Sequence, residues 1–472
     1  MFIGREKEIA TLEQTYRTAE GRFVVIYGRR RIGKSRLVEE FGEGKKSFYH
    51  FEAIEGLDTA GQIQHFTAQL FAQKKEPLAA SLQFRTWNEV FSYVTDHLIE
   101  TTAGTKPILF FDEFQWMAAG QSKLVSTVKY FWDNFWKKKK AMLILCGSVA
   151  SFMVRRVLSS KALYGRVSAE ILLRGLSPDE AIRFFKGKRS DEELLKYQLV
   201  FGTVPKYLEE IDCSRSFEQN MNRLCFSPNG LMLKEPERIF YSQFREGRTY
   251  QQIVTLLQNG PRTTGEIARR LGIPSGGGLK LYLDNLEHAD IIRSVVPFDR
   301  DARSKFRAYT LVDEFLSFYF KYLEPNLATI RESTSRKLFE TVTKDSFDIW
   351  LGFAFERFCL KYAGILARIM GFEDTVLRAA PYFGRNDERF QIDLVYRRSD
   401  KVITVCEIKY QDREIGPQVI PAVERKCRLL KIPRGYTLER ALISLYGPDK
   451  VLRESDYFHH IVTLKEMLGK TK

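Results

Sequence analysis

The residues with the clearest chemistry form a glycine-rich loop near the start of the chain. An apolar run over 23–27 leads into Gly28, four further residues and Gly33-Lys34-Ser35, after which apolar residues recur at helical spacing. The glycines let the backbone curl so that consecutive NH groups face inward, where the following helix N-terminus adds partial positive charge. In such loops the lysine reaches the β- and γ-phosphates, and the serine hydroxyl ligates Mg²⁺. The spacing predicts a strand, a phosphate-binding loop and a helix, with Lys34 as a catalytic residue. The expected nucleotide contacts are Gly28, Arg29, Arg30, Arg31, Ile32, Gly33, Lys34, Ser35 and Arg36.

A second apolar run, 107–111, ends in the carboxylates Asp112 and Glu113. Such a strand is expected to be buried on both faces, as in parallel sheets, whose ligands bind at the carboxyl ends of the strands. We expect Asp112 to hold a Mg²⁺ ion together with Ser35, and Glu113 to polarise the attacking water in nucleotide hydrolysis. A helix cap is the structural alternative for this pair.

Two further polar residues lie beside predicted strands of the same region. Ser148 ends the apolar strand 141–147 and is a candidate sensor of the γ-phosphate, although a strand-terminal turn explains it equally well. Arg166 precedes the predicted strand 169–173 and is a candidate for stabilising the transferring charge, within the chain or from a neighbouring subunit. A surface arginine in a loop is the alternative interpretation.

Another set of charged residues lies on a predicted hairpin near the C-terminus, with strands over 389–396 and 402–410. With a three-residue loop Asp393 stands directly opposite Glu407, whereas a two-residue loop would shift them by one. Lys409 points to the same face as Glu407. Opposed like charges destabilise a sheet unless positive charge lies between them. Two carboxylates and a lysine on one face are the parts of a Mg²⁺ site for phosphodiester cleavage, in which Lys409 positions water or neutralises charge. A salt-bridge ladder at a sheet edge is the alternative.

The predicted elements divide the chain into several α/β and helical domains, because 472 residues exceed one ordinary core. Over 249–312 the sequence predicts three helices and a hairpin, typical of a winged helix. Its third helix carries Lys280 but also Asp284 and Glu287, so protein docking or an intramolecular role is as well supported as DNA reading. The predicted domains are a P-loop core over 1–175, a helical lid over 176–245, a winged helix over 246–325, a helical connector over 326–345 and a C-terminal α/β domain over 346–472.

The composition of the chain indicates which partners it binds and in which cellular compartment it is found. The net charge of +15 favours a polyanionic partner, nucleic acid and most simply DNA, although a solvated basic surface is the alternative. The six cysteines show no C-x-x-C motif and no metal spacing, which indicates buried thiols in a reducing cytosol. No apolar stretch reaches the roughly 18 residues of a membrane span, so we expect a cytoplasmic protein without a membrane partner. The sequence also allows a homo-oligomer.

Taken in order, the motifs of the first half resemble those of the archaeal-type AAA+ ATPases of the STAND class. The resemblance covers about residues 1–240 and implies an ASCE P-loop core with a parallel sheet, a helical lid, and ATP with Mg²⁺ as cofactors. It implies that Pro205 lies near the adenine, and the segment Phe2, Ile3, Gly4 and Arg5 is expected to close over it. The motifs are Phe2-Ile3-Gly4-Arg5-Glu6, Gly28 to Ser35, Phe110 to Gln115, Cys146-Gly147-Ser148, Gly165-Arg166 and Gly202-Thr203-Val204-Pro205, the last replacing a more usual Gly-Gly-x-Pro.

The last part of the chain resembles the PD-(D/E)XK nucleases, as in the C-terminal domain of unknown function attached to these ATPases. The residues that carry the resemblance are Glu356, Asp393 and Glu407-Ile408-Lys409, within about residues 335–472. It implies a restriction-endonuclease-like α/β domain in which Glu356, Asp393 and Glu407 are metal ligands and Asp393, Glu407 and Lys409 are catalytic. Members of this superfamily often keep the fold and lose the activity.

Two hypotheses follow. In the first, an ATPase or ATP-driven switch positions a DNA-directed domain with nuclease-like chemistry. In the second, ATP binding shifts a signalling scaffold between closed and open arrangements, and the later domains bind DNA or protein without cutting. Metal-dependent cleavage separates the two.

Overall fold

The computed structural model describes most of the chain, in two units. The described residues are 2–74, 82–100, 104–118, 123–148, 152–161, 163–244, 247–296, 298, 307–384 and 390–470. The N-terminal unit comprises Met1–Gly175 with His288–Asp290, and the C-terminal unit comprises Leu176–Glu287 with Ile291–Lys472. Each unit is described by itself.

A five-stranded parallel sheet forms the centre of the N-terminal unit. Its order is β2 (Phe48–Glu52), β3 (Ile108–Asp112), β4 (Met142–Gly147), β1 (Arg22–Tyr27) and β5 (Ala169–Leu172). The predicted strands 107–111 and 141–147 are confirmed within one residue at each end. Strand β4 lies between β1 and β3, so Ser148 emerges between the phosphate loop and the acidic pair.

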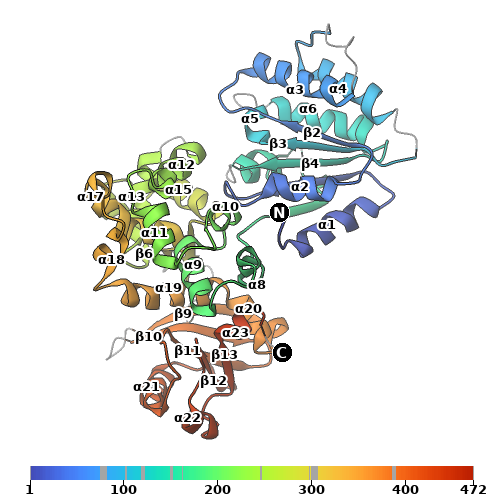
Figure 1. Ribbon diagram of the computed structural model, residues 1–472. Coiled ribbons are helices and arrows are strands. Elements are labelled where there is room, and N and C mark those ends of the chain that lie inside the picture. Colours follow the sequence, from blue (N-terminus) through green and yellow to red (C-terminus); the bar gives the residue numbers. More distant parts are fainter. Residues whose placement is uncertain are drawn as a thin grey trace. The chain divides into compact units, whose positions relative to one another are not determined.

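Helices cover both faces of this sheet, which is why its central strands are apolar throughout. In Figure 1, α3, α4 and α6 lie over one face, and α1 and α2 lie over the other. The helices are α1 (Glu6–Arg17), α2 (Lys34–Gly42), α3 (Thr59–Lys74), α4 (Trp87–Val94), α5 (Phe114–Met117) and α6 (Lys123–Phe131), with π-helical turns η2 (Thr95–Ile99), η3 (Trp132–Trp136) and η4 (Met153–Leu158). Aromatic side chains from α3, α4, η3 and the strands fill the core between α3, α4, α6 and the sheet.

The first part of the C-terminal unit is helical. A Ser-x-x-Glu capping box at Ser177 begins α8. The elements are α8 (Pro178–Ala181), η5 (Ile182–Phe185), α9 (Asp191–Phe201), α10 (Pro205–Glu209), α11 (Phe217–Cys225), η6 (Leu231–Lys234) and α12 (Glu235–Gln243).

Three helices and a small antiparallel sheet follow, in the order that the sequence predicts. They are α13 (Gly247–Leu257), β6 (Arg262–Thr263), α14 (Thr264–Leu271), α15 (Gly277–His288), β7 (Ile292–Val295) and β8 (Ala308–Leu311), with sheet order β6-β8-β7. The predicted hairpin loop 299–304 lies outside the described residues. Beside it, Phe298 is buried in the core of the C-terminal sheet with Tyr382 and Ile392. Arg378 of that sheet donates to the Val296 carbonyl at 2.7 Å, so this hairpin is anchored within its own chain.

Short helices connect this part to a second five-stranded sheet. The connecting helices are α16 (Glu314–Phe318), η7 (Tyr319–Leu323), η8 (Glu324–Asn326), α17 (Leu327–Glu332) and α18 (Leu338–Thr343). The last part consists of α19 (Phe347–Lys361), α20 (Ala363–Ile369), η9 (Glu373–Thr375), β9 (Val376–Gly384), β10 (Phe390–Arg398), β11 (Val402–Lys409), η10 (Pro417–Val419), α21 (Ile420–Leu429), β12 (Thr437–Ser444), α22 (Lys450–Glu454), β13 (His460–Thr463) and α23 (Leu464–Met467). The sheet order is β13-β12-β11-β10-β9; β9–β11 are antiparallel, and β11–β13 are parallel.

Two further expectations can be compared with the structure. All six cysteines are free thiols, and all except the partly exposed Cys213 are buried. Within the described ranges, no helix is long and apolar enough to cross a membrane.

Candidate functional site

The phosphate loop has the conformation that its glycines predict. Gly33 has φ 88° at the start of α2, in the left-handed region that favours glycine. A Cβ on Gly28 would lie 2.2 Å from the Leu173 carbonyl oxygen, so β1 and the residue after β5 pack too closely for a side chain. Lys34 is buried and donates to the Arg29 carbonyl oxygen at 3.0 Å. The lysine is therefore held inside the loop.

The arginines around the loop differ in their surroundings. Arg29 is buried, and Arg30 lies 3.5 Å from Glu55. Arg31 has φ 68°, a left-handed backbone within the loop. Arg36 pairs with Glu40 one turn along α2, at 3.4 Å, so its side chain follows the exposed helix surface. A nucleotide contact from Arg36 stays a prediction.

Arg5 anchors the segment that precedes α1. Its guanidinium group is buried and donates to the carbonyl oxygens of Ile32 at 3.1 Å and Arg174 at 2.6 Å. It therefore joins the N-terminal segment to the phosphate loop and to the end of β5. Phe2, Ile3 and Gly4, which precede it, are partly exposed. Their expected contact with adenine stays a prediction.

Asp112 is buried at the carboxyl end of β3, in contact with the phosphate loop. Burial would raise the pKa of this carboxyl group, but polar contacts with His50, Ser35 and the Glu113 amide outweigh burial and hold the pKa below its usual value. His50 Nε2 lies 3.7 Å from the carboxylate. Asp112 and Ser35, predicted as Mg²⁺ ligands, are thus neighbours.

Glu113 is held by two polar side chains. Ser148 donates to its Oε2 at 2.7 Å, and Gln115 donates both to Glu113 and, at 3.1 Å, to Ser148. Glu113 itself has φ 48°, a left-handed conformation that costs an ordinary residue about 1–2 kcal/mol. Gly147 makes room for the Gln115 amide, since a Cβ there would lie 2.7 Å from Oε1. The three side chains form one hydrogen-bonded set, here called the Glu113 network.

Arg166 does not join this site within the chain. Its Nε and Nη2 donate to the two Asp133 oxygens at 2.7 and 2.9 Å. The strand that follows, β5, begins at Ala169, which pairs with Val24 near the start of β1. Arg166 therefore lies near the amino ends of the strands, whereas the phosphate loop follows the carboxyl end of β1. The expected role within the chain is not supported by this geometry, and a role from a neighbouring subunit stays a prediction.

Pro205 begins α10 in the C-terminal unit. Its predicted proximity to adenine concerns both units and stays a prediction.

The hairpin of the C-terminal sheet has the register expected for a three-residue loop. Three residues, 399–401, separate β10 from β11, and Leu394 pairs with Cys406. Asp393 and Glu407 occupy the next position of this register. The pairing of β10 with β9 shifts between Ile392 and Val395, and such bulges often redirect a side chain next to a functional site.

Glu407 forms ion pairs with two lysines. Its Oε1 lies 2.8 Å from Lys409 Nζ, and its Oε2 accepts a hydrogen bond from Lys426 of α21 at 2.6 Å. Only 1% of the residue is exposed. The positive charge expected between the opposed carboxylates is therefore present, and both carboxylate oxygens are engaged.

Glu356, Asp393 and Glu407 are the three carboxylates predicted to bind a metal ion. Across the part of the chain that the structure describes, no group of three His, Cys, Asp or Glu residues is arranged to hold one. Both Glu407 oxygens contact lysine side chains. The assignment of these carboxylates as metal ligands stays a prediction.

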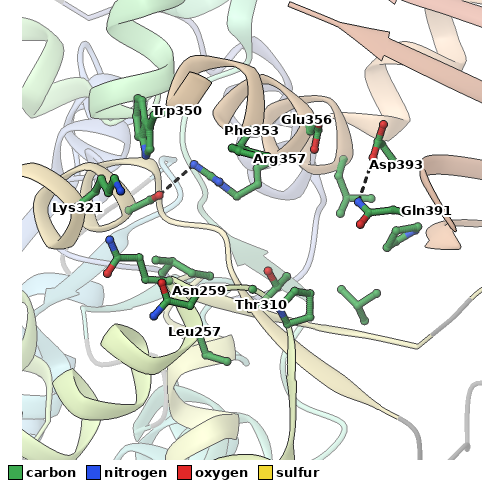
Figure 2. A pocket seen from close by; sticks show the side chains of 18 of the residues that line it. Leu257, Asn259, Thr310, Lys321, Trp350, Phe353, Glu356, Arg357, Gln391 and Asp393 are labelled. Atoms are coloured by element: carbon green, nitrogen blue, oxygen red, sulfur yellow. Dashed lines mark hydrogen bonds between the residues drawn. The ribbon is translucent and has the colours of Figure 1, made fainter. Parts of the chain in front are cut away.

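Glu356 and Asp393 form an acidic pair in the same region. Burial and the Asp393 charge raise the pKa of Glu356 to about 7, although Arg357, Lys409 and Lys426 oppose this. Burial also raises the pKa of Asp393, against the charge of Lys426. Gln391 donates to Asp393 Oδ1 at 3.0 Å (Figure 2). Below, Glu356, Asp393, Glu407, Lys409 and Lys426 are called the acidic cluster.

Comparison with known families identifies the N-terminal part. Residues 2–211 match the model of an ATPase domain found predominantly in Archaea. The chain carries an ATPase domain of this family. Residues 319–419 match a second model, described as archaeal bacterial proteins of unknown function.

Individual relatives agree with this assignment. An uncharacterized protein of Methanocaldococcus jannaschii is 29% identical over 415 residues, covering 87% of this chain and 88% of the relative. An uncharacterized ATP-binding protein of Pyrococcus abyssi is 25% identical over 245 residues, covering 44% of this chain and 71% of the relative. A solved Walker-type ATPase of Pyrococcus abyssi is 21% identical, with a TM-score of 0.51, and the match covers 68% of this chain and 96% of that one. This last similarity shows only that the two proteins share a fold.

Sequence reasoning missed two residues that touch the predicted sites. In the ATPase domain, Gln115 follows the acidic pair by two positions, and that closeness was the available signal. Lys426 lies 17 positions after Lys409 on another element, and only the packing of α21 beside the sheet brings it to Glu407.

Proposed function

We propose that the ATPase domain binds ATP with Mg²⁺ and hydrolyses it. One observation carries this proposal: Ser35, at the end of the phosphate loop, meets the buried carboxylate of Asp112, while Glu113 follows in the adjacent position. A P-loop hydrolase needs these groups together, because metal ligands and a water-orienting residue must converge on the γ-phosphate.

The residues fit Mg²⁺. A serine hydroxyl and an ionised carboxylate are oxygen donors of the kind that Mg²⁺ prefers, and the lowered pKa of Asp112 keeps it ionised at neutral pH. The bound ion would neutralise charge on the phosphate oxygens. Lys34 would leave its loop carbonyl for the phosphates, and Glu113 would orient water.

Binding and turnover of ATP by the Lys34→Ala variant test this proposal. We expect weaker ATP binding and loss of hydrolysis, since the lysine neutralises the β- and γ-phosphates. Unchanged binding and turnover would show that nucleotide is handled elsewhere.

We further propose that nucleotide state controls a DNA-directed C-terminal unit. The three helices and small sheet of residues 247–311 support the winged-helix prediction, and the net charge of +15 suits a polyanion. The anchored Phe298 favours an intramolecular role for the hairpin, which leaves DNA contact to other surfaces of the unit.

Phosphodiester cleavage is the second candidate activity, favoured by the electrostatics of the acidic cluster. Burial and the charge of Asp393 raise the pKa of Glu356, and burial and the charge of Glu407 raise the pKa of Asp393. A bound cation would lower both pKa values, so these carboxyl groups are of the kind that a metal site uses. The protein would be incubated with plasmid, linear and single-stranded DNA plus Mg²⁺ or Mn²⁺, with and without ATP. Cleavage that disappears in Asp393→Ala supports the assignment, and cleavage that persists there contradicts it.

A scaffold that binds without cutting is the competing function. It predicts no metal-dependent cleavage and a nucleotide-dependent change in assembly size, which light scattering would measure. The engagement of Glu407 by both lysines favours this alternative.

A further inference from the structure

A cavity of about 460 Å³ lies in the C-terminal unit beside the acidic cluster. Its walls come from α19, from the turn after α13 and from β8, and Glu356 and Asp393 stand at one end (Figure 2). This volume falls within the roughly 300–1,000 Å³ of ordinary ligand sites. A ligand in the cavity would therefore reach the acidic cluster directly.

One wall is apolar and open to solvent. Ile349 and Phe353, one turn apart on α19, are 66% and 56% exposed, and the buried Trp350 of the same helix also lines the cavity. Single exposed apolar residues are normal on protein surfaces. Two that line one cavity beside charged groups indicate a surface that contacts a flat, partly apolar ligand.

The remaining lining is polar and carries both donors and acceptors. Asn259 and Gln391 supply amides, which can meet the donor and acceptor pattern of any base edge. Lys321 and Arg357 supply positive charge on the side away from Asp393 (Figure 2). Arg357 also donates to Ser317 Oγ at 3.0 Å, which fixes its guanidinium group against the cavity wall.

We propose that this cavity receives one unpaired base of a DNA strand, stacked on Phe353, with the adjoining phosphate next to Lys321. This inference rests on the proposed DNA-directed role of the C-terminal unit and names the form of DNA that it takes. An aromatic face binds bases of any sequence by stacking, and nearby cations follow the backbone. A paired base cannot enter, because its edge and faces are occupied in the duplex.

Fluorescence anisotropy with the full chain tests the proposal. The probes are fluorescein-labelled (dT)20 and a blunt 20-base-pair duplex, both in EDTA so that metal-dependent cleavage cannot contribute. The variants are Phe353→Ala, Phe353→Trp and, as a control, Leu377→Ala, which removes a side chain that is 63% exposed on β9 outside the cavity. We expect Phe353→Ala to weaken (dT)20 binding about 10-fold or more, Phe353→Trp to restore it and Leu377→Ala to leave it unchanged.

The outcomes separate this inference from the proposed function. If (dT)20 binds and Phe353→Ala binds it equally well, the cavity assignment is wrong while the DNA-directed role stands. Equal losses on single strand and duplex also contradict it, since a paired base cannot reach Phe353. If neither probe binds the unaltered protein, both the cavity assignment and the DNA-directed role fail.

Discussion

At the scale of single residues, the carboxylate that we propose orients water for ATP hydrolysis, Glu113, is held by two polar side chains. Ser148 and Gln115 both donate to Glu113, and Gln115 also donates to Ser148. A carboxylate fixed in this way is preorganised, because its orientation need not be found during the reaction. We therefore expect Gln115 to be a positioning residue that acts through Glu113.

Replacing Gln115 tests this role. We expect Gln115→Leu to lower kcat for ATP hydrolysis by about 10- to 100-fold, as loss of a supporting hydrogen-bond partner does in other sites, with little change in the Kd for ATP. Gln14→Leu, on the exposed surface of α1, is the matched control. A parallel loss of ATP binding would instead indicate a structural role.

A second residue-scale prediction concerns the buried pair of Glu314 and Lys361, whose Nζ lies 2.7 Å from Oε1. Burial raises the pKa of Glu314 above 4.5, and Lys361 opposes the shift. Lys361→Met should cost about 3–5 kcal/mol of unfolding free energy at pH 8. Because the pKa of Glu314 is raised in the folded state, the protein loses folding stability as the pH rises above 4.5. The loss of unfolding free energy caused by Lys361→Met should therefore be smaller at pH 5 than at pH 8.

Urea denaturation at the two pH values measures this difference. The double variant Glu314→Gln/Lys361→Met should recover much of the loss, because it leaves no unpaired buried charge. Equal costs at pH 5 and pH 8 would show that Glu314 does not titrate with the pair.

At the scale of elements, local patterns were sufficient for the predicted strands of both sheets. The runs ending at Asp112 and Ser148 are apolar throughout, and such runs specify buried parallel strands. The hairpin register followed from a three-residue loop. Contacts between elements were not predictable. Lys426 of helix α21 reaches Glu407 of strand β11, and Arg166 pairs with Asp133, 33 positions away in the sequence. Local spacing carries no information about such packing.

The hairpin anchor gives an element-scale prediction. Phe298 is 7% exposed among core residues of the C-terminal sheet. Phe298→Ala should lower the unfolding free energy of the C-terminal unit by about 3–5 kcal/mol, the usual cost of removing a buried aromatic ring. Thermal unfolding measures the loss, with Tyr164→Ala, at an 82% exposed position, as control. An unchanged transition would show that the hairpin does not depend on this anchor.

At the scale of the whole molecule, the chain joins an ATPase domain to a C-terminal unit with its own sheet, cavity and acidic cluster. A ligand that binds one conformation of a protein more tightly shifts the population toward that conformation. ATP can therefore control the C-terminal unit only if it binds some conformations of the whole chain more tightly than others. The two family matches, over 2–211 and 319–419, cover different parts of the chain.

ATP hydrolysis by Glu113→Gln, measured together with ATP binding, tests the central claim most directly. The substitution keeps the shape of the side chain and removes the carboxylate that orients water. We predict that Glu113→Gln binds ATP as the unaltered protein does and that its turnover falls by about 100-fold or more. Turnover equal to that of the unaltered protein would contradict the assignment of this site as an ATPase centre.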